Sequence, residues 1–274
     1  MEPVSSGSPM VGPYKITGVL PASRWGQRWL AFHEGRQCPF MLYQFEGFAK
    51  KTDQRRFITA FEKLSALEHP HLLSLMEFAF DGNTDSALLV TPYPATHDGL
   101  LTMSRLLGQK QGRMPVPEVR RAIVQLLETL QFVHDRDLLH GPLSLDEILV
   151  DPHGSLIIDL YGFRRTVEGI HNDSLFDRAD EVRSIVEMAY TLITGLSAEA
   201  PRIRMESVRG RSDRSLDTWI EAGLDPAAGF ESATAALRAL EKPDAIPHFQ
   251  PVIKANTKSS SLLWRLRPSG KPKG

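Results

Sequence analysis

The stretch LHGPLSLDEILV, residues 139–150, narrows the choice of fold more than any other part of the sequence. A polar loop, His140 to Glu147, runs into a short apolar segment typical of a β-strand. The turn Asp-Pro-His-Gly follows at residues 151–154, and a second apolar segment leads into Asp159-Leu160-Tyr161-Gly162. The two apolar segments are therefore expected to pair as short strands.

The chain upstream of this stretch has the pattern of a small β-rich lobe. A helix is predicted at about residues 53–67, because Phe57, Phe61, Leu64 and Leu67 recur with helical spacing. Aromatic and aliphatic segments bounded by turn signals predict five strands, at residues 14–20, 28–32, 39–45, 72–80 and 87–93.

The chain downstream of residue 100 is mostly helical in pattern. Residues 117–136 are amphipathic, with Pro117 in a first-turn position. Residues 177–194 end at Gly195 and are expected to form a helix buried in the centre of a lobe. Two short helices are predicted at residues 216–222 and 231–240.

The bulk composition is that of a soluble globular protein. The 274 residues are 42% hydrophobic and 24% charged, and the net charge of −1 gives no field that would attract nucleic acid. The single cysteine, Cys38, excludes an internal disulfide framework and favours a reducing cytoplasm. No apolar run approaches the ~18 residues of a membrane span. Residues 1–13 are predicted to be a flexible leader and residues 244–274 a basic disordered tail.

Six sequence marks, in order and at the right spacing, resemble the protein-kinase family, and compact bacterial Ser/Thr kinases most of all. The resemblance covers about residues 14–240. It implies an α+β, two-lobed kinase fold, with a small five-stranded antiparallel lobe at about 14–93 and a mostly helical lobe at about 94–243. The marks are a loop like the Gly-rich loop at 20–31, EHPHLL at 68–73, residues 139–150, IIDLYGF at 157–163, a central helix at 181–195 and DPAAGFESA at 225–233.

The resemblance places unusual residues where the family holds ATP. The phosphate loop loses two of its three glycines, and the hinge loses an N–H donor because proline has none. An ordinary β-hairpin is the simpler interpretation of that loop. Arg28 is expected to fill the adenine pocket or to extend outward. The positions concerned are Pro21, Ser23 and Gly26 in the loop, Arg28 and Met41 beside adenine, Thr91 and Pro94 in the hinge, and Tyr43 and Ala60 in place of the Lys–Glu pair.

The catalytic positions are altered as well. Pro142 stands where the family has its general base, and a proline accepts no proton. Glu147 replaces the metal-binding Asn and Leu160 the metal-binding Asp. Asp159 lies one residue early, and strand alternation should aim it at the opposite face. Glu147 and Asp159 remain weak metal-ligand candidates, and a helix-capping role for Glu147 is the simpler alternative. Asp180 or Glu181 is expected to brace the catalytic loop.

These losses predict a pseudokinase: not an enzyme, without a cofactor, and acting as a protein-binding scaffold or allosteric signalling module. Its partner would be a protein, for example an active kinase, and not nucleic acid. The alternatives are an unconventional kinase or nucleotidyl-transferring enzyme with displaced Mg-ATP, and a small-molecule sensor. Candidate partner contacts are Arg202, Arg204, Arg209, Arg211 and Trp264.

Overall fold

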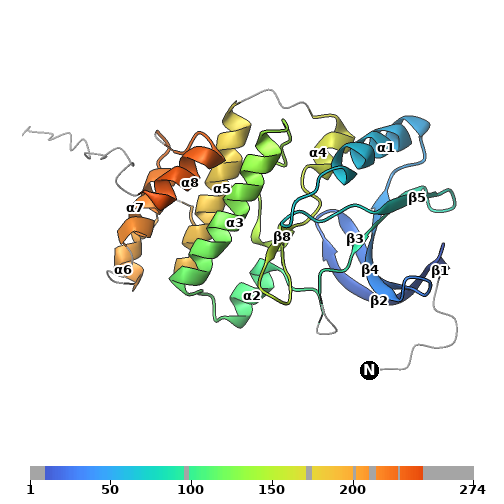
Figure 1. The fold of residues 1–274 in the computed structure, drawn as a ribbon, viewed down its shortest axis with the longest axis horizontal. Coiled ribbons are helices and arrows are strands. Elements are labelled where there is room, and N and C mark those ends of the chain that lie inside the picture. The colour runs from blue at the N-terminus through green and yellow to red at the C-terminus, as the bar shows by residue number, and fades with distance from the viewer. Residues whose placement is uncertain are drawn as a thin grey trace, which may run out of the picture.

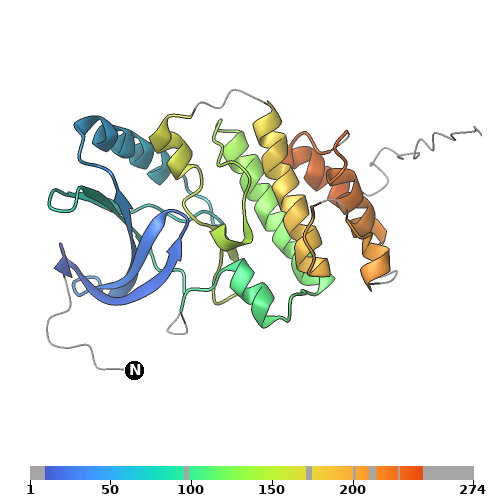
Figure 2. The ribbon, with the colours of Figure 1, turned by 180° about the vertical axis from the view of Figure 1, so that it is seen from behind.

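A computed structural model describes the chain over residues 10–95, 99–170, 175–199, 202–209, 214–227 and 229–242. The described part forms two lobes, one built on a sheet and the other on helices (Figure 1). The same division is visible from behind in Figure 2. The two-lobed α+β fold predicted from the sequence is thus confirmed. No helix in these described ranges combines the length and the apolar character needed to cross a bilayer.

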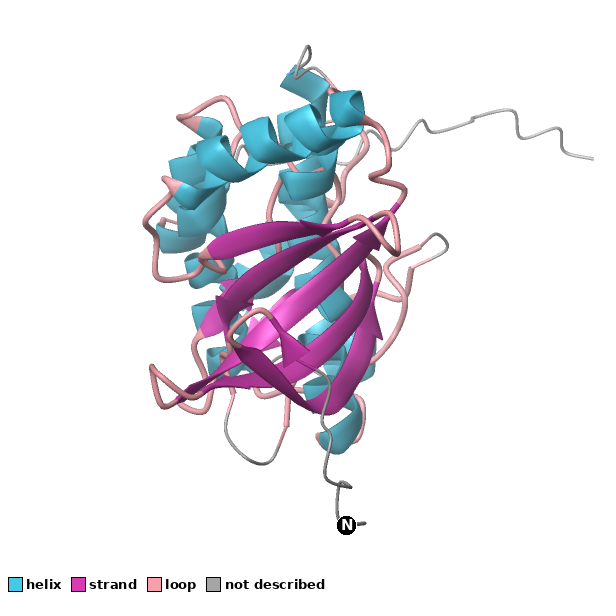
Figure 3. Cartoon of the chain, turned by 90° about the vertical axis from the view of Figure 1, so that its right-hand side faces the viewer, coloured by secondary structure: helices cyan, strands magenta, loops and turns pink. Residues whose placement is uncertain are grey.

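The first lobe contains a six-stranded antiparallel sheet in the order β1-β2-β3-β4-β6-β5 (Figure 3). Along β2, exposed residues alternate with more buried ones, as expected for a strand with one face toward the core. The elements are β1 (Met10–Val11), β2 (Tyr14–Ser23), β3 (Gly26–His33), β4 (Cys38–Glu46), α1 (Lys51–Ser65), β5 (Glu77–Asp81) and β6 (Ser86–Pro92).

Two sequence predictions for this lobe need correction. The sheet has a sixth strand, because Met10 and Val11, assigned above to a leader, pair with Lys15 and Tyr14. The strand predicted at 72–80 begins only at Glu77, because the preceding residues bond to the other lobe. There the Leu73 N–H donates to the Ile158 carbonyl at 3.1 Å.

The second lobe is organised around two long helices, α3 and α5, which pack side by side (Figure 1). Their apolar faces bury Leu127, Leu130, Val186 and Ile193 in the main core. Every helix predicted here is present, with ends moved by at most two residues. The elements are α2 (Met103–Gln109), α3 (Val116–His134), the 3-10 turn η1 (Leu145–Glu147), α4 (Phe163–Glu168), α5 (Leu175–Thr194), α6 (Met205–Arg209), α7 (Arg214–Gly223) and α8 (Ala233–Glu241).

The predicted short strand pair joins the two lobes. β7 (Ile148–Val150) and β8 (Leu156–Ile158) pair antiparallel. The Ile158 carbonyl also accepts from the Leu73 N–H, and the Ile158 N–H donates to the His71 carbonyl, in the segment that precedes β5. Ile148 pairs with Ile158, so the loop before β7, His140 to Glu147, and the segment after β8, Asp159 to Gly162, lie at the same end of the strand pair. From this end Glu147 and Asp159 contact arginines of the first lobe. The predicted tail, residues 244–274, lies outside the described residues.

Candidate functional site

The hairpin between β2 and β3 reaches over the cleft. Ser23 pairs with Gly26, which leaves Arg24 and Trp25 at a two-residue tip. Gly26 has a φ of +136°, and a Cβ there would lie 2.4 Å from the Gln44 carbonyl oxygen, so this position requires glycine. Pro21 and Ser23 belong to the strand. The segment is therefore a β-hairpin, as the simpler interpretation predicted, with a register shift between Leu20 and Ser23.

Arg28 turns inward from this hairpin and fills the cleft. Its side chain is 2% exposed. Its Nε–H donates to the Pro21 carbonyl at 2.8 Å, and an Nη1–H donates to Asp159 Oδ2 at 3.2 Å. The guanidinium also lies 6.0 Å from the centre of the Tyr43 ring. Of the two placements open to Arg28 from the sequence, the structure shows the inward one.

Tyr43 occupies the lysine position on β4 and bonds to the same carboxylate. Its hydroxyl donates to Asp159 Oδ1 at 2.5 Å, and the residue is fully buried. Burial, together with the charge of Asp159, raises the pKa of Tyr43 well above its ordinary value. The phenol therefore keeps its proton and remains a donor. Ala60 on α1, at the position of the family's glutamate, is buried in the main core.

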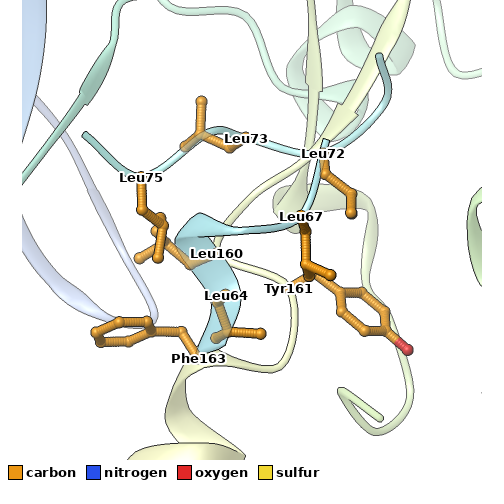
Figure 4. Close-up of a pocket in the computed structure, with 8 residues that line it drawn as sticks. All are labelled: Leu64, Leu67, Leu72, Leu73, Leu75, Leu160, Tyr161 and Phe163. Atoms are coloured by element: carbon orange, nitrogen blue, oxygen red, sulfur yellow. The ribbon is translucent and has the colours of Figure 1, made fainter. Parts of the chain in front are cut away.

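The expected orientation of Asp159 was wrong. The prediction from strand alternation fails because β8 ends at Ile158, one residue before it, and Leu160 has a φ of +44°. This left-handed residue redirects the chain, so that Asp159 faces the cleft while Leu160 packs under α1 with Leu64 and Leu67. Figure 4 shows these leucines around a cavity of about 10 Å³, which at most holds one water molecule.

The Asp159 carboxyl is only 1% exposed. Burial raises its pKa to about 6, against the opposing effects of the Arg28 charge and the Tyr43 hydrogen bond. The two donors satisfy both carboxylate oxygens, as a buried charge requires. Asp159 is therefore an anion in a dry site that is compensated by one cation of the same chain.

Glu147 is the second carboxylate of the cleft. It closes a capping box with Ser144, whose hydroxyl donates to Oε2 at 2.7 Å, and His140 Nε2 lies 2.8 Å from Oε1. The Arg24 guanidinium crosses from the hairpin tip to Oε1 at 2.8 Å. Burial acts to raise the pKa of Glu147, but the contacts with His140, Ser144 and Arg24 outweigh it and leave that pKa below its ordinary value. The capping role predicted for this residue is confirmed.

Glu181, on α5, braces the catalytic loop. Its Oε1 accepts the N–H groups of His140 at 2.5 Å and of Gly141 at 2.7 Å. Its Oε2 accepts the Tyr161 hydroxyl at 2.7 Å and lies 2.9 Å from His134 Nε2. The sequence offered Asp180 or Glu181 for this task, and the structure selects Glu181. Pro142, at the general-base position, is exposed in the same loop.

The hinge-side and partner-side positions differ in burial, and their predicted roles stay predictions. Met41 and Thr91 are neighbours in the sheet and fully buried, and Pro94 is half-buried in the linker. Arg202 is half-buried and Arg204 exposed. Arg211 and Trp264, and the side chain of Arg209, lie outside the described residues. Sequence reasoning undervalued Arg24, which it noted only as bulk at the loop tip. The sequence signal that could have identified Arg24 is a pair of arginines in the hairpin, Arg24 and Arg28, together with two acids in the second lobe.

Comparison with known proteins identifies the family. Residues 28–189, more than half of the chain, match the sequence profile of "Protein tyrosine and serine/threonine kinase". The chain belongs to this family. It is 25% identical over 194 residues to the Ser/Thr-protein kinase pkn1 of Chlamydia caviae, covering 68% of this chain and 30% of pkn1. It is 26% identical over 121 residues to the mouse eIF-2-alpha kinase GCN2, covering 44% of this chain and 7% of that protein.

A solved structure of similar fold is the kinase domain of Mycobacterium tuberculosis PknI, in a double mutant. The TM-score is 0.65 at 18% identity, and the match covers 88% of this chain and all of that domain. This likeness extends through both lobes.

Family membership corrects two predictions made from the sequence. The matched family and its relatives are protein kinases, enzymes that use ATP with Mg²⁺, so the expectations of a non-enzyme and of no cofactor are wrong. The donor chemistry fits magnesium, because Glu147 and Asp159 supply the hard oxygen ligands that this ion prefers. The described conformation, however, holds both carboxylates against arginines.

Proposed function

We propose that this chain is a protein-kinase-family signalling domain, an ATP- and Mg²⁺-dependent phosphotransferase whose cleft is gated by Arg24 and Arg28. The observation that carries the proposal is that each carboxylate suited to magnesium is paired with one of these arginines. Asp159 and Glu147 would hold the ion once the arginines release them. The bound metal would supply charge neutralisation for the nucleotide phosphates.

The gate is one hairpin, because both arginines come from the turn and strands that close over the cleft. Arg28 is buried and anchored to Pro21 in its own hairpin, whereas the Arg24 side chain is 46% exposed. A movement of the hairpin away from the second lobe would break both ion pairs together. The same movement would remove the guanidinium of Arg28 from the space beside Tyr43 and Asp159.

Phosphoryl transfer at this site should be slow. Positioning and electrostatic stabilisation provide most of the catalysis in this reaction class, and loss of a general base at Pro142 costs about 10²–10⁴ in rate. A slow rate of phosphoryl transfer is compatible with a module that signals mainly by its conformation and by binding a protein partner. A reducing compartment such as the cytoplasm is part of the proposal, and the single cysteine supports it.

A combined binding and transfer experiment tests the proposal. The unfolding temperature is measured with and without Mg-ATP for the wild type and for Arg28→Met, and phosphate transfer from labelled ATP is followed on the protein itself and on a generic protein substrate. Occupancy at 100 times the Kd stabilises a fold by about 2.7 kcal/mol. We expect Arg28→Met to be stabilised at lower ATP concentrations than the wild type.

The matched control is Asp159→Asn, which removes the proposed ligand and should abolish both stabilisation by Mg-ATP and transfer. If the folded wild type and the folded Arg28→Met protein both fail to bind Mg-ATP and to transfer phosphate, the proposal is wrong.

A further inference from the structure

A depression of about 350 Å³ lies beside the gate, outside the cleft itself. Four segments border it: the hairpin tip, the end of β4, the first turns of α1, and α4, which packs against α1 (Figure 1). Aromatic side chains line it, namely Trp25, Phe45, Phe48 and Phe163. Its volume is at the lower end of the range for small-ligand sites, about 300–1,000 Å³.

Four side chains with N–H donors border this depression, Arg24, Trp25, Arg56 and Arg164, together with three carboxylates. Arg56 is 61% exposed, and the nearest approach of its guanidinium to Asp53 is only 3.8 Å. Arg56 is therefore available to a ligand that supplies acceptors, whereas Arg24 and Arg164 already pair with Glu147 and Glu168. The Trp25 indole N–H lacks a partner in the described part of the chain but is buried.

Three carboxylates border the same depression and compete with an anionic ligand for these donors. Glu168 already accepts a hydrogen bond from Arg164 at 2.5 Å. Asp53 lies in the first turn of α1, where a carboxylate interacts favourably with the helix dipole. Glu46 is exposed at the end of β4. Among the described residues of this lining, the donors least engaged by carboxylates are therefore Arg56, whose approach to Asp53 is 3.8 Å, and the Trp25 indole.

Arg24 connects this depression to the gate. Its guanidinium borders the depression and also forms the ion pair with Glu147. An anion that enters beside Trp25 competes with Glu147 for that guanidinium. Because a ligand shifts an equilibrium by its differential affinity for the two states, such an anion favours the released hairpin.

We propose that this depression binds a protein partner through a segment that presents an aromatic ring with an anionic group, such as a phosphorylated tyrosine, and that this binding draws Arg24 away from Glu147. The ring stacks among the aromatic side chains, and the anion accepts from Arg24, Arg56 and the Trp25 indole. The inference rests on the proposed gate for its consequence, but binding at the depression is a separate event that needs neither ATP nor metal.

Phenyl phosphate is the probe that tests the binding step. The indole N–H resonance of Trp25, assigned by its absence in Trp25→Phe, is followed by NMR in the absence of nucleotide and metal. We expect a saturable downfield shift with a Kd of about 1 mM, in the range of a small fragment. Inorganic phosphate and phenol, each with half of the chemistry, should bind at least about tenfold more weakly.

Two neighbouring arginines of α1 provide a matched pair of variants. Arg56→Gln should weaken phenyl phosphate binding about tenfold, whereas Arg55→Gln, exposed on the same helix but away from the depression, should leave it unchanged. No saturable shift, or equal effects of the two variants, would overturn the inference. This readout involves no ATP. A negative titration would therefore overturn binding at the depression without affecting the gate proposal, and a failure of Mg-ATP binding would overturn the gate proposal without affecting binding at the depression.

Discussion

Two buried carboxylates of the second lobe, Asp159 and Glu181, have similar burial but opposite surroundings. Asp159 is 1% exposed and Glu181 is fully buried. Glu181 accepts backbone N–H groups of the catalytic loop, and Asp159 accepts side chains that come from the other lobe. The comparison teaches that the loop's shape is fixed inside one lobe, whereas the cleft's chemistry depends on contacts between lobes, which a hinge motion can break.

The largest expected effect comes from removing the brace. Glu181→Ala leaves two backbone N–H groups and the Tyr161 hydroxyl without their acceptor in a dry site, so we expect the free energy of unfolding to fall by about 3–5 kcal/mol. Urea denaturation measures it. The control, Glu187→Ala, removes a half-exposed carboxylate of the same helix and should cost about 0.5 kcal/mol. Equal losses in the two variants would show that the brace contributes nothing special.

Removing the buried cation of the cleft should have a smaller, pH-dependent effect. Arg28→Met leaves Asp159 buried without its cation, a situation that costs about 3 kcal/mol when the carboxylate is charged. At pH 5 Asp159 takes up a proton instead, so the loss should shrink. Denaturation at pH 5 and pH 8 measures the difference. On an Asp159→Asn background the pH dependence should disappear, and its persistence there would contradict the assignment to Asp159.

The pKa values of the two cleft carboxylates should be shifted in opposite directions. The pKa of Asp159 is raised to about 6, above its ordinary value of 3.8, so its ionisation opposes folding and its contribution to stability falls as the pH rises from about 4 through 6. The pKa of Glu147 is lowered, so its contribution is present above its ordinary value of 4.5 and is lost as the pH falls through its folded pKa. Carboxyl ¹³C NMR measures both midpoints. An Asp159 midpoint below that of Glu147 would contradict this order.

The smallest effect should come from Arg24→Gln. The Arg24 side chain is half-exposed, so its ion pair with Glu147 is screened by solvent, and a loss of about 1 kcal/mol or less is expected. The control is Arg36→Gln, which removes a surface pair with Glu77 whose two members are exposed to a similar degree. A loss of stability larger than that of Arg28→Met would show that the Arg24–Glu147 pair contributes more than the Arg28–Asp159 pair to holding the gate closed.

The fold was predictable from the sequence because its signals are local or periodic. The helix of residues 51–65 is indicated by the spacing of Phe57 and Leu64, which it buries. The hairpin requires a glycine at position 26. The sixth strand was missed because Met10 and Val11 carry too little pattern to be told from a leader. The early end of the strand at 72–80 depends on hydrogen bonds to residues about 85 positions away.

The candidate site was predictable as a set of residues but not as a geometry. The positions of Tyr43, Ala60, Pro142 and Glu147 follow from motif order. The orientation of Asp159 depends on one left-handed residue, Leu160, and no alternation rule extends beyond the end of a strand. The enzyme class was also misjudged, because each altered position counted as a loss, whereas the family match points to an enzyme.

The central claim is that Arg24 and Arg28 compete with a divalent cation for Glu147 and Asp159. Electron paramagnetic resonance of Mn²⁺, titrated together with ATP, measures this directly for the wild type and for Arg24→Gln/Arg28→Met, with circular dichroism to establish that both are folded. The account predicts that the variant binds the Mn²⁺–ATP pair about tenfold more tightly, a gain of about 1.4 kcal/mol. A folded variant that binds it no more tightly than the wild type would contradict the account.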